Sequence, residues 1–170
     1  MLARNETIIK WGLYAAVSLL GALAQGILGQ SITLLGVIPF LFPLFAAIPA
    51  TYEASAPGTA FALAVGIFCD LLLPAPLPCF YTLVFPLVGL FSALLSESIL
   101  PAGYLCSAVA SAFGFFLTGL FHIFLLWMDG KAPGSAAFRT MVLEFLITLP
   151  AVFPMTAMYR WIYRKTHLDN

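Results

Sequence analysis

The sequence predicts an all-α fold: a polytopic integral membrane bundle of six transmembrane helices. Hydrophobic residues make up 62% of the 170 residues and charged residues 8%, with a mean hydropathy of +1.05. Residues 11–52 and 98–128 contain no Asp, Glu, Lys or Arg, and about 20 predominantly apolar residues suffice for a spanning helix. These runs lack the alternation of a β-barrel strand. We therefore expect residues 1–170 to form a single transmembrane domain with no aqueous domain.

The first two spans are expected at residues 8–29 and 32–50. The first ends in a turn-like Gly-Gln-Ser sequence. The second contains three prolines, each of which removes a backbone hydrogen bond, so we expect it to be bent or partly unwound. The prolines are Pro39, Pro43 and Pro49. The polar segment 51–58 then returns the chain to water.

The third and fourth spans are expected at residues 59–73 and 79–95. Three prolines in the segment 74–78 prevent the third span from continuing as a helix. The fourth span closes at the polar residues 96–98. The connection between these two spans is therefore a short turn.

The fifth and sixth spans are expected at residues 101–127 and 139–163. Pro101 suits the first turn of a helix, and residues 129–135 form the most polar internal loop. The sixth span contains Pro150 and Pro154. An even number of spans places both termini on the same side of the membrane.

The distribution of basic residues predicts which side this is. The residues near the termini are Arg4, Lys10, Arg160, Arg164 and Lys165, against Lys131 and Arg139 elsewhere. Because cytoplasmic segments carry the excess of Lys and Arg, both termini are expected in the cytoplasm. The alternative, a signal peptide cleaved near residues 22–24, is disfavoured because apolar sequence continues almost without a pause into the second span.

Small residues spaced four apart predict the faces on which helices pack, since helices in lipid approach most closely at such residues. The first span has one such ladder and the fifth span has another, and the third span has a shorter one that ends in an acid. Their members are Ser18, Ala22 and Gly26; Cys106, Ala110, Gly114, Thr118 and His122; and Ala62, Gly66 and Asp70. Each ladder marks either intramolecular packing or a docking face for a partner subunit.

Asp70 is the only charged side chain between residues 54 and 96. A carboxylate at the bilayer centre costs about 2.5–3.5 kcal/mol on insertion scales, so it needs a partner or a function. Counting along the helices places Asp70, His122 and Glu144 within roughly 10 Å of the outer surface. We therefore expect one intramembrane polar cluster, structural or coupled to a partner, in which Asp70 accepts a proton from His122.

An enzymatic function is the alternative for this cluster, with His122 as a base, and proton coupling is another. No Ser, Cys or metal-ligand motif occurs at a recognisable spacing, and no basic pair is placed to hold a phosphate. We therefore expect no catalytic residue, no metal and no cofactor. The cysteines Cys69, Cys79 and Cys106 are expected to act as small hydrophobic residues. The zero net charge implies no nucleic-acid partner, and residues 160–165 suit a membrane anchor.

The ladder Gly58, Ala62, Gly66 and Asp70, followed by a proline turn and Gly89, resembles the rod shape-determining protein MreD family. In that family the third span carries a glycine ladder that ends in Asp, an outer turn often containing Pro-Leu-Gly follows, and the fourth span contains a glycine. Pro76-Leu77 matches the turn, but Pro78 replaces its glycine. Pro39 also lies where the family tends to place a proline. The resemblance covers residues 36–97.

The resemblance implies a non-enzymatic scaffold of the bacterial cell-wall elongation machinery, located in the inner membrane and required for rod shape. It implies that the chain binds an MreC-like protein and connects, directly or indirectly, to MreB, RodA and a penicillin-binding protein. The alternative is the substrate-capture subunit of an energy-coupling-factor vitamin transporter, which is similar in size and span number. The ladder from Ser18 to Gly26 would then dock the coupling subunit, and the cluster around Asp70 and His122 would contact the vitamin.

Overall fold

The computed structural model describes residues 2–31, 37–73, 77–130 and 135–167, with side chains described from residue 7 to residue 166 except at 28–36, 74–76 and 131–136. Six helices lie within these ranges. In chain order they are α1 (Leu2–Ser31), α2 (Phe42–Ala50), α3 (Ser55–Leu72), α4 (Phe80–Ser98), α5 (Tyr104–Met128) and α6 (Ser135–His167). Residues 74–76 of the turn expected at 74–78, including Pro76, and the loop residues 131–134, including Lys131, lie outside the described residues, as does the side chain of Arg4.

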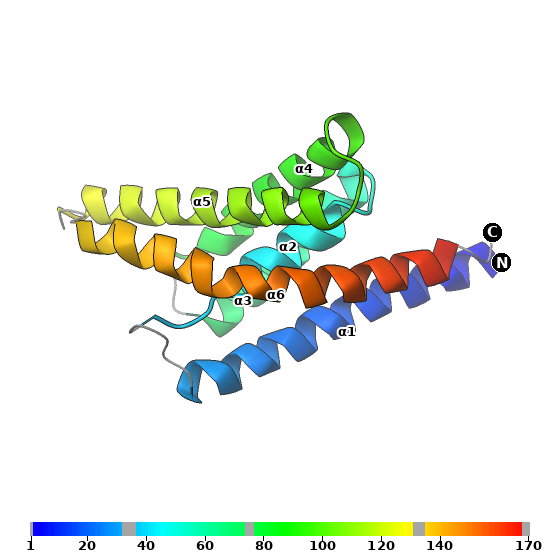
Figure 1. Ribbon diagram of the computed structural model, residues 1–170, viewed down its shortest axis with the longest axis horizontal. Coiled ribbons are helices and arrows are strands. Elements are labelled where there is room, and N and C mark those ends of the chain that lie inside the picture. The colour runs from blue at the N-terminus through cyan, green and yellow to red at the C-terminus, as the bar shows by residue number, and fades with distance from the viewer. Residues whose placement is uncertain (1, 32–36, 74–76, 131–134, 168–170) are drawn as a thin grey trace.

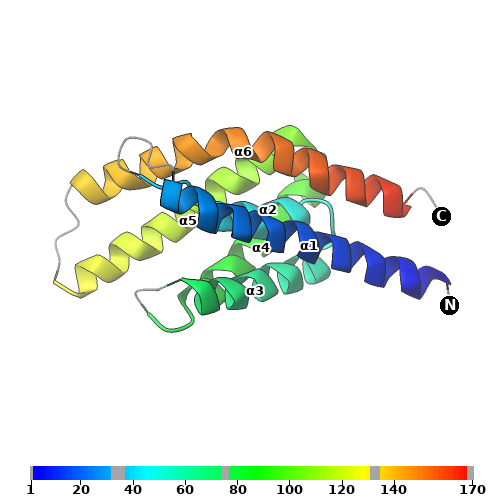
Figure 2. The same cartoon turned by 90° about the horizontal axis from the view of Figure 1, so that it is seen from below.

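The helices form an elongated bundle whose two termini lie at the same end (Figures 1 and 2). The helices α3 and α4 form an antiparallel pair with extensive contact, and α5 and α6 form a second pair. The helix α1 lies along α6 toward the shared end of the termini.

Five of the six helices are long and apolar enough to cross a membrane, and α2 is the exception. It has nine residues, about 14 Å of helix against a hydrocarbon thickness of about 30 Å. The expected helical span 32–50 is therefore wrong at residues 37–41, which are not helical, and residues 32–36 lie outside the described part. Pro43 stands in the first turn of α2, where its missing N–H costs no hydrogen bond.

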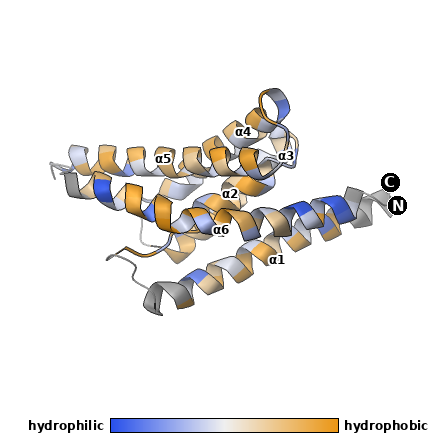
Figure 3. Ribbon diagram, in the orientation of Figure 1, coloured by the Kyte–Doolittle hydropathy of each residue, from blue (hydrophilic) through white to orange (hydrophobic). Residues whose placement is uncertain are grey.

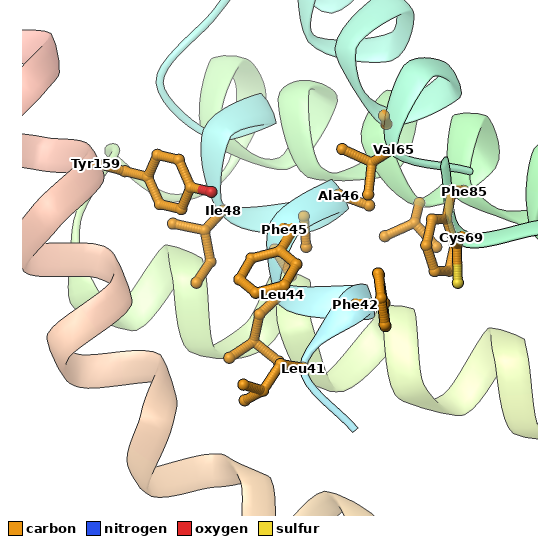
Figure 4. Packing of buried hydrophobic residues seen from close by; sticks show 14 of the residues in the cluster. Leu41, Phe42, Leu44, Phe45, Ala46, Ile48, Val65, Cys69, Phe85 and Tyr159 are labelled. Atoms are coloured by element: carbon orange, nitrogen blue, oxygen red, sulfur yellow. The ribbon is translucent and has the colours of Figure 1, made fainter. Parts of the chain in front are cut away.

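All nine residues of α2 are buried, and the other five helices surround it. Figure 4 shows Phe42, Phe45 and Ile48 of α2 packed among side chains from α3, α4 and α6. Non-helical backbone at membrane depth is tolerated only where it is buried in protein, because lipid offers no hydrogen-bond partner. The enclosure of α2 therefore explains how the chain accommodates a helix too short to span.

The outer helices present their apolar side chains to the surroundings of the bundle. Within its apolar window α4 has 50% of its residues buried, whereas α1 has 11% and α6 has 17%. Figure 3 shows hydrophobic residues along most of the helices, with hydrophilic residues gathered toward the terminal ends of α1 and α6. Exposed apolar side chains over this length are what a bilayer-embedded bundle requires.

Candidate functional site

The carboxylate of Asp70 caps the N-terminus of α4. Its Oδ1 accepts the Tyr81 backbone N–H at 3.0 Å, and its Oδ2 accepts the Thr82 backbone N–H at 2.8 Å and the Thr82 hydroxyl at 2.6 Å. The first N–H groups of a helix have no partner within the helix, and the helix dipole favours negative charge there. Cys79, the residue at the N-cap position, makes no side-chain capping hydrogen bond. Asp70 of α3 therefore supplies the cap that α4 lacks.

A close approach of the two helices allows this cap to form. A Cβ atom on Gly66, one turn before Asp70, would lie 2.6 Å from the Tyr81 carbonyl oxygen. Glycine thus lets the first turn of α4 lie directly against α3. The contact brings the N–H groups of Tyr81 and Thr82 within reach of a side chain as short as aspartate.

The rest of the ladder on α3 packs in the same interface. A Cβ on Gly89 of α4 would lie 2.5 Å from the Ala62 Cβ atom and 3.2 Å from the Gly58 carbonyl oxygen. Ala62 has no exposed surface, and a Cβ on Gly58 would approach Ala50 at 3.1 Å. The ladder residues that the sequence singled out therefore hold α3 against α4 and the end of α2.

His122, the partner expected for Asp70, is not among the hydrogen-bond partners found for that carboxylate in the described residues. It is exposed on α5, with its ring 6.5 Å from that of Phe80. His122 and Glu144 line a cavity of about 280 Å³ between α5 and α6, which Tyr81 also lines. In the part of the chain that the structure describes, no hydrogen bond joins Asp70 to His122 or to Glu144. The backbone of Tyr81 bonds to Asp70 on one side, and the cavity with His122 and Glu144 lies on the other.

The cavity combines apolar walls with a few polar groups. Phe40, Phe115 and Met141 contribute apolar surface, while Tyr81, Thr118, Thr140, His122 and Glu144 contribute hydroxyl, imidazole and carboxyl groups. This is the usual composition of a small-molecule site. An imidazole and a carboxyl group around one cavity suit hydrogen bonding to a polar ligand or to a bound water molecule.

The non-helical segment before α2 lies beside this cavity and is held by two side chains from other helices. Gln25 Oε1 of α1 accepts the Leu41 N–H at 2.8 Å, and Thr148 Oγ1 of α6 accepts the Phe40 N–H at 3.2 Å. The Thr148 hydroxyl also donates to the Glu144 carbonyl at 2.6 Å. These bonds replace the intrahelical partners that the amides lack. Neither Gln25 nor Thr148 was among the expected site residues, although a glutamine within an apolar span indicates a polar contact.

A buried ion pair connects α1 to the chain that follows α2. Lys10 Nζ lies 2.8 Å from Glu53 Oε2, and the two side chains are only 13% and 7% exposed. The Tyr14 hydroxyl donates to Glu53 Oε1 at 3.1 Å. Lys10 was expected only as a topology signal, and Glu53 lies in the polar segment 51–58 expected to return the chain to water. Their pairing depends on how α1 lies against the end of α2, which the sequence does not show.

The ladder on α1 has one buried end and one open end. Ser18 is buried and hydrogen-bonds the Tyr159 hydroxyl of α6 at 2.8 Å. Ala22 is partly buried against the core. Gly26 is exposed, and a Cβ there would meet nothing within 4 Å. The first half of this ladder therefore packs within the chain, and the second half faces outward.

The ladder on α5 faces the interior for most of its length. Cys106 and Ala110 have no exposed surface. A Cβ on Gly114 would lie 3.1 Å from Val88 Cγ1 and 3.5 Å from Pro43 Cβ, which places this glycine against α4 and α2. Only His122, at the end of the ladder, is exposed.

The described residues include no group of three His, Cys, Asp or Glu side chains that would hold a metal ion. The fold and the sites define the chain as a helical bundle with several membrane-length helices, a buried half-length helix and a largely apolar cavity that carries a few polar groups. Searches for similarity find no matching family model, no matching curated protein and no matching solved structure.

Proposed function

We propose that the chain is a non-enzymatic membrane scaffold of the MreD type, which acts in the bacterial cell-wall elongation machinery and is required for rod shape. The observation that carries the proposal is the α3–α4 interface. Gly58, Ala62, Gly66 and Gly89 pack there, and Asp70 caps the helix that follows. The residues that carry the resemblance to the MreD family therefore pack together in one interface.

The proposed partner is an MreC-like protein, with MreB, RodA and a penicillin-binding protein reached directly or through it, and with membrane lipids around the bundle. The outward face of α1 supports a helical partner. A Cβ on Gly12 or Gly26 would meet nothing within 4 Å, so a second helix has room to approach there. The proposed location is the bacterial inner membrane, with both termini in the cytoplasm.

Depletion of the protein in its native host tests the cellular function. The proposal predicts that rod-shaped cells become round, and that a single-span MreC-like protein copurifies in mild detergent. Replacement of Gly26 by Leu, at a position where a Cβ would meet no described atom within 4 Å, should weaken copurification while the protein still accumulates. Normal rods after depletion would refute the scaffold.

The cavity supports a second candidate, the substrate-capture subunit of an energy-coupling-factor vitamin transporter. His122 and Glu144 line it, near the end of the bundle opposite the termini, where α5 ends and α6 begins (Figure 1). Titration of the purified chain with a panel of B vitamins, followed by intrinsic fluorescence, tests this candidate. Tight binding that is lost in Glu144→Gln and His122→Phe would favour the transporter over the scaffold.

A further inference from the structure

The end of α6 and the start of α5 form a basic groove with aromatic walls. It has a volume of about 530 Å³ and is lined by Tyr104, Ala157, Arg160, Trp161, Arg164 and Lys165. Residues 157, 160, 161, 164 and 165 lie on one face of α6 because they follow the spacing of helical turns. Three positive charges thus converge on one depression, against the first residue of α5.

Ring contacts hold two of these cations. The guanidinium of Arg160 lies 5.7 Å from the centre of the Tyr104 ring, and the ammonium of Lys165 lies 4.9 Å from that of Trp161. A cation on a ring face keeps its N–H donors available to another partner. In the described part of the chain, no carboxylate forms an ion pair with Arg160, Arg164 or Lys165.

Lys10, near the same end of the bundle, provides a contrast. It is paired with Glu53 and mostly buried, so its charge is already compensated inside the protein. Within the described ranges, the three cations of the groove have no such compensation. The groove is therefore a place where an anion from outside the chain is favoured.

The depth of the groove points to the lipid headgroups. The helix α6 has 33 residues, about 50 Å of helix, which exceeds the hydrocarbon thickness by about 20 Å. Trp and Tyr beside the cations are typical of the membrane interface. Basic sites between transmembrane helices at this level suit the phosphates of anionic lipids.

The surface next to the groove suits an acyl chain. Phe153 lies two turns before Arg160 on α6 and is 60% exposed. Its ring lies 6.3 Å from the ring of Tyr104. Leu105, beside Tyr104, is 68% exposed. A charged groove continued by exposed apolar side chains matches an amphiphile. We propose that this groove binds an anionic phospholipid, with the phosphate held by Arg160, Arg164 and Lys165 and an acyl chain lying along Phe153. This inference does not depend on the scaffold or transporter function.

Native mass spectrometry of the full chain in detergent tests the proposal, with phosphatidylglycerol and phosphatidylcholine of identical acyl chains as probes. The expected dissociation constant for phosphatidylglycerol is about tenfold lower than for phosphatidylcholine. The combined substitution Arg160→Gln, Arg164→Gln and Lys165→Gln should remove this difference. Arg139→Gln, which neutralises an exposed cation near the start of α6, is the matched control and should retain it.

Two further arms identify the ligand and the groove. Inorganic phosphate at millimolar concentration should leave phosphatidylglycerol bound. Displacement of the lipid by phosphate would show that the groove binds a free anion and would refute the proposal of a lipid ligand. Tyr104→Leu keeps every charge but removes the ring beneath Arg160, so it should reduce the preference several-fold. Any of three results would overturn the proposal. They are an unchanged preference for phosphatidylglycerol in Tyr104→Leu, equal binding of the two lipids to the wild type, and a preference for phosphatidylglycerol that survives the triple substitution. Circular dichroism and gel filtration establish that each variant is folded.

Discussion

Asp70 and Glu97 cap each other's helices from opposite ends of the α3–α4 pair. Asp70, in the last turn of α3, accepts the N–H groups of Tyr81 and Thr82 at the start of α4. Glu97, in the last turn of α4, accepts the N–H of Ser55 at the start of α3 at 3.0 Å. Each carboxylate thus lies at the positive end of the other helix dipole. This relationship gives the carboxylate of Asp70 its partner in an otherwise apolar segment.

Substitution of Asp70 should lower stability in proportion to the capping bonds lost. Asp70→Leu leaves two N–H groups of α4 without an acceptor and should cost about 3 kcal/mol of unfolding free energy. Asp70→Asn keeps one acceptor oxygen and should cost about 1 kcal/mol. Unfolding in an SDS titration measures both, with membrane abundance and cell shape recorded beside it. An Asn variant that accumulates normally but is as inactive as Leu would indicate a functional carboxylate instead.

Alanine at the glycines of the α3–α4 interface should destabilise the bundle. Gly66→Ala brings a methyl group against the Tyr81 carbonyl, which is backbone and cannot move aside freely, and should cost about 1–3 kcal/mol. Gly12→Ala and Gly26→Ala are matched controls, because a Cβ there meets nothing within 4 Å. Thermal unfolding in detergent should separate Gly66→Ala from the two control variants by a lower unfolding midpoint. Equal midpoints for Gly66→Ala and Gly26→Ala would contradict the packing of α3 on α4.

Separation of the Lys10–Glu53 pair should be more harmful than its complete removal. Glu53→Gln leaves a mostly buried ammonium without its counter-ion, and loss of one partner of a buried pair costs about 3 kcal/mol. The double variant Lys10→Met, Glu53→Gln removes both charges, so part of the stability should return. A double-mutant cycle measured by SDS unfolding gives the coupling free energy between the Lys10 and Glu53 side chains. Strictly additive losses would show that the two charges do not interact.

The hydroxyl of Thr148 should matter more than that of Thr156 on the same helix. Thr148→Val removes the acceptor of the Phe40 N–H, and an unsatisfied buried donor costs about 1–3 kcal/mol. The Thr156 hydroxyl is buried with no hydrogen-bond partner in the described part of the chain. Thr156→Val should therefore be neutral or stabilising. The two variants have the same change in shape, so a comparison of their unfolding midpoints isolates the hydrogen bond.

The native cysteines report the proposed topology. Cys79 is exposed at the end of the bundle away from the termini, whereas Cys69 and Cys106 are buried. A membrane-impermeant maleimide added to intact cells, with the outer membrane permeabilised where the host has one, should label the wild type at Cys79 and leave Cys79→Ser unlabelled. Cysteine at exposed Ser98 in that background should react only after the inner membrane is opened. Labelling of Ser98→Cys from outside intact cells would show that the orientation is opposite to the proposed one.

Hydropathy predicted the five membrane-length helices within a few residues, because lipid exposure and backbone satisfaction both require long apolar runs. It failed at residues 37–41 of the expected span 32–50, which are not helical, since a segment buried in protein is as apolar as one in lipid. Every residue of α2 is buried by its neighbours. Pro39 and Pro43 did indicate an interrupted helix, but they did not show where the helix begins.

The candidate site was predicted less completely than the fold. Counting residues predicted a similar depth for Asp70, His122 and Glu144, but a predicted depth does not say which way each side chain points around its helix. The partners of Asp70 are mainly backbone N–H groups. Nearly every residue type has such a group, so the amino-acid sequence does not mark these partners. The small residues Gly66 and Gly89 were found because close approach demands them. The pairing of Lys10 with Glu53 had no comparable local signal.

The enclosure of α2 determines when the protein reaches its final fold during synthesis. The chain makes α2 second, yet the helices α3, α4, α5 and α6 that surround it emerge later. Thr148, which accepts the Phe40 N–H, belongs to the last helix. A chain truncated after α5 therefore exposes an unsatisfied, non-helical backbone within the membrane. Such fragments should be substrates for membrane proteases, and the addition of α6 should remove this exposure.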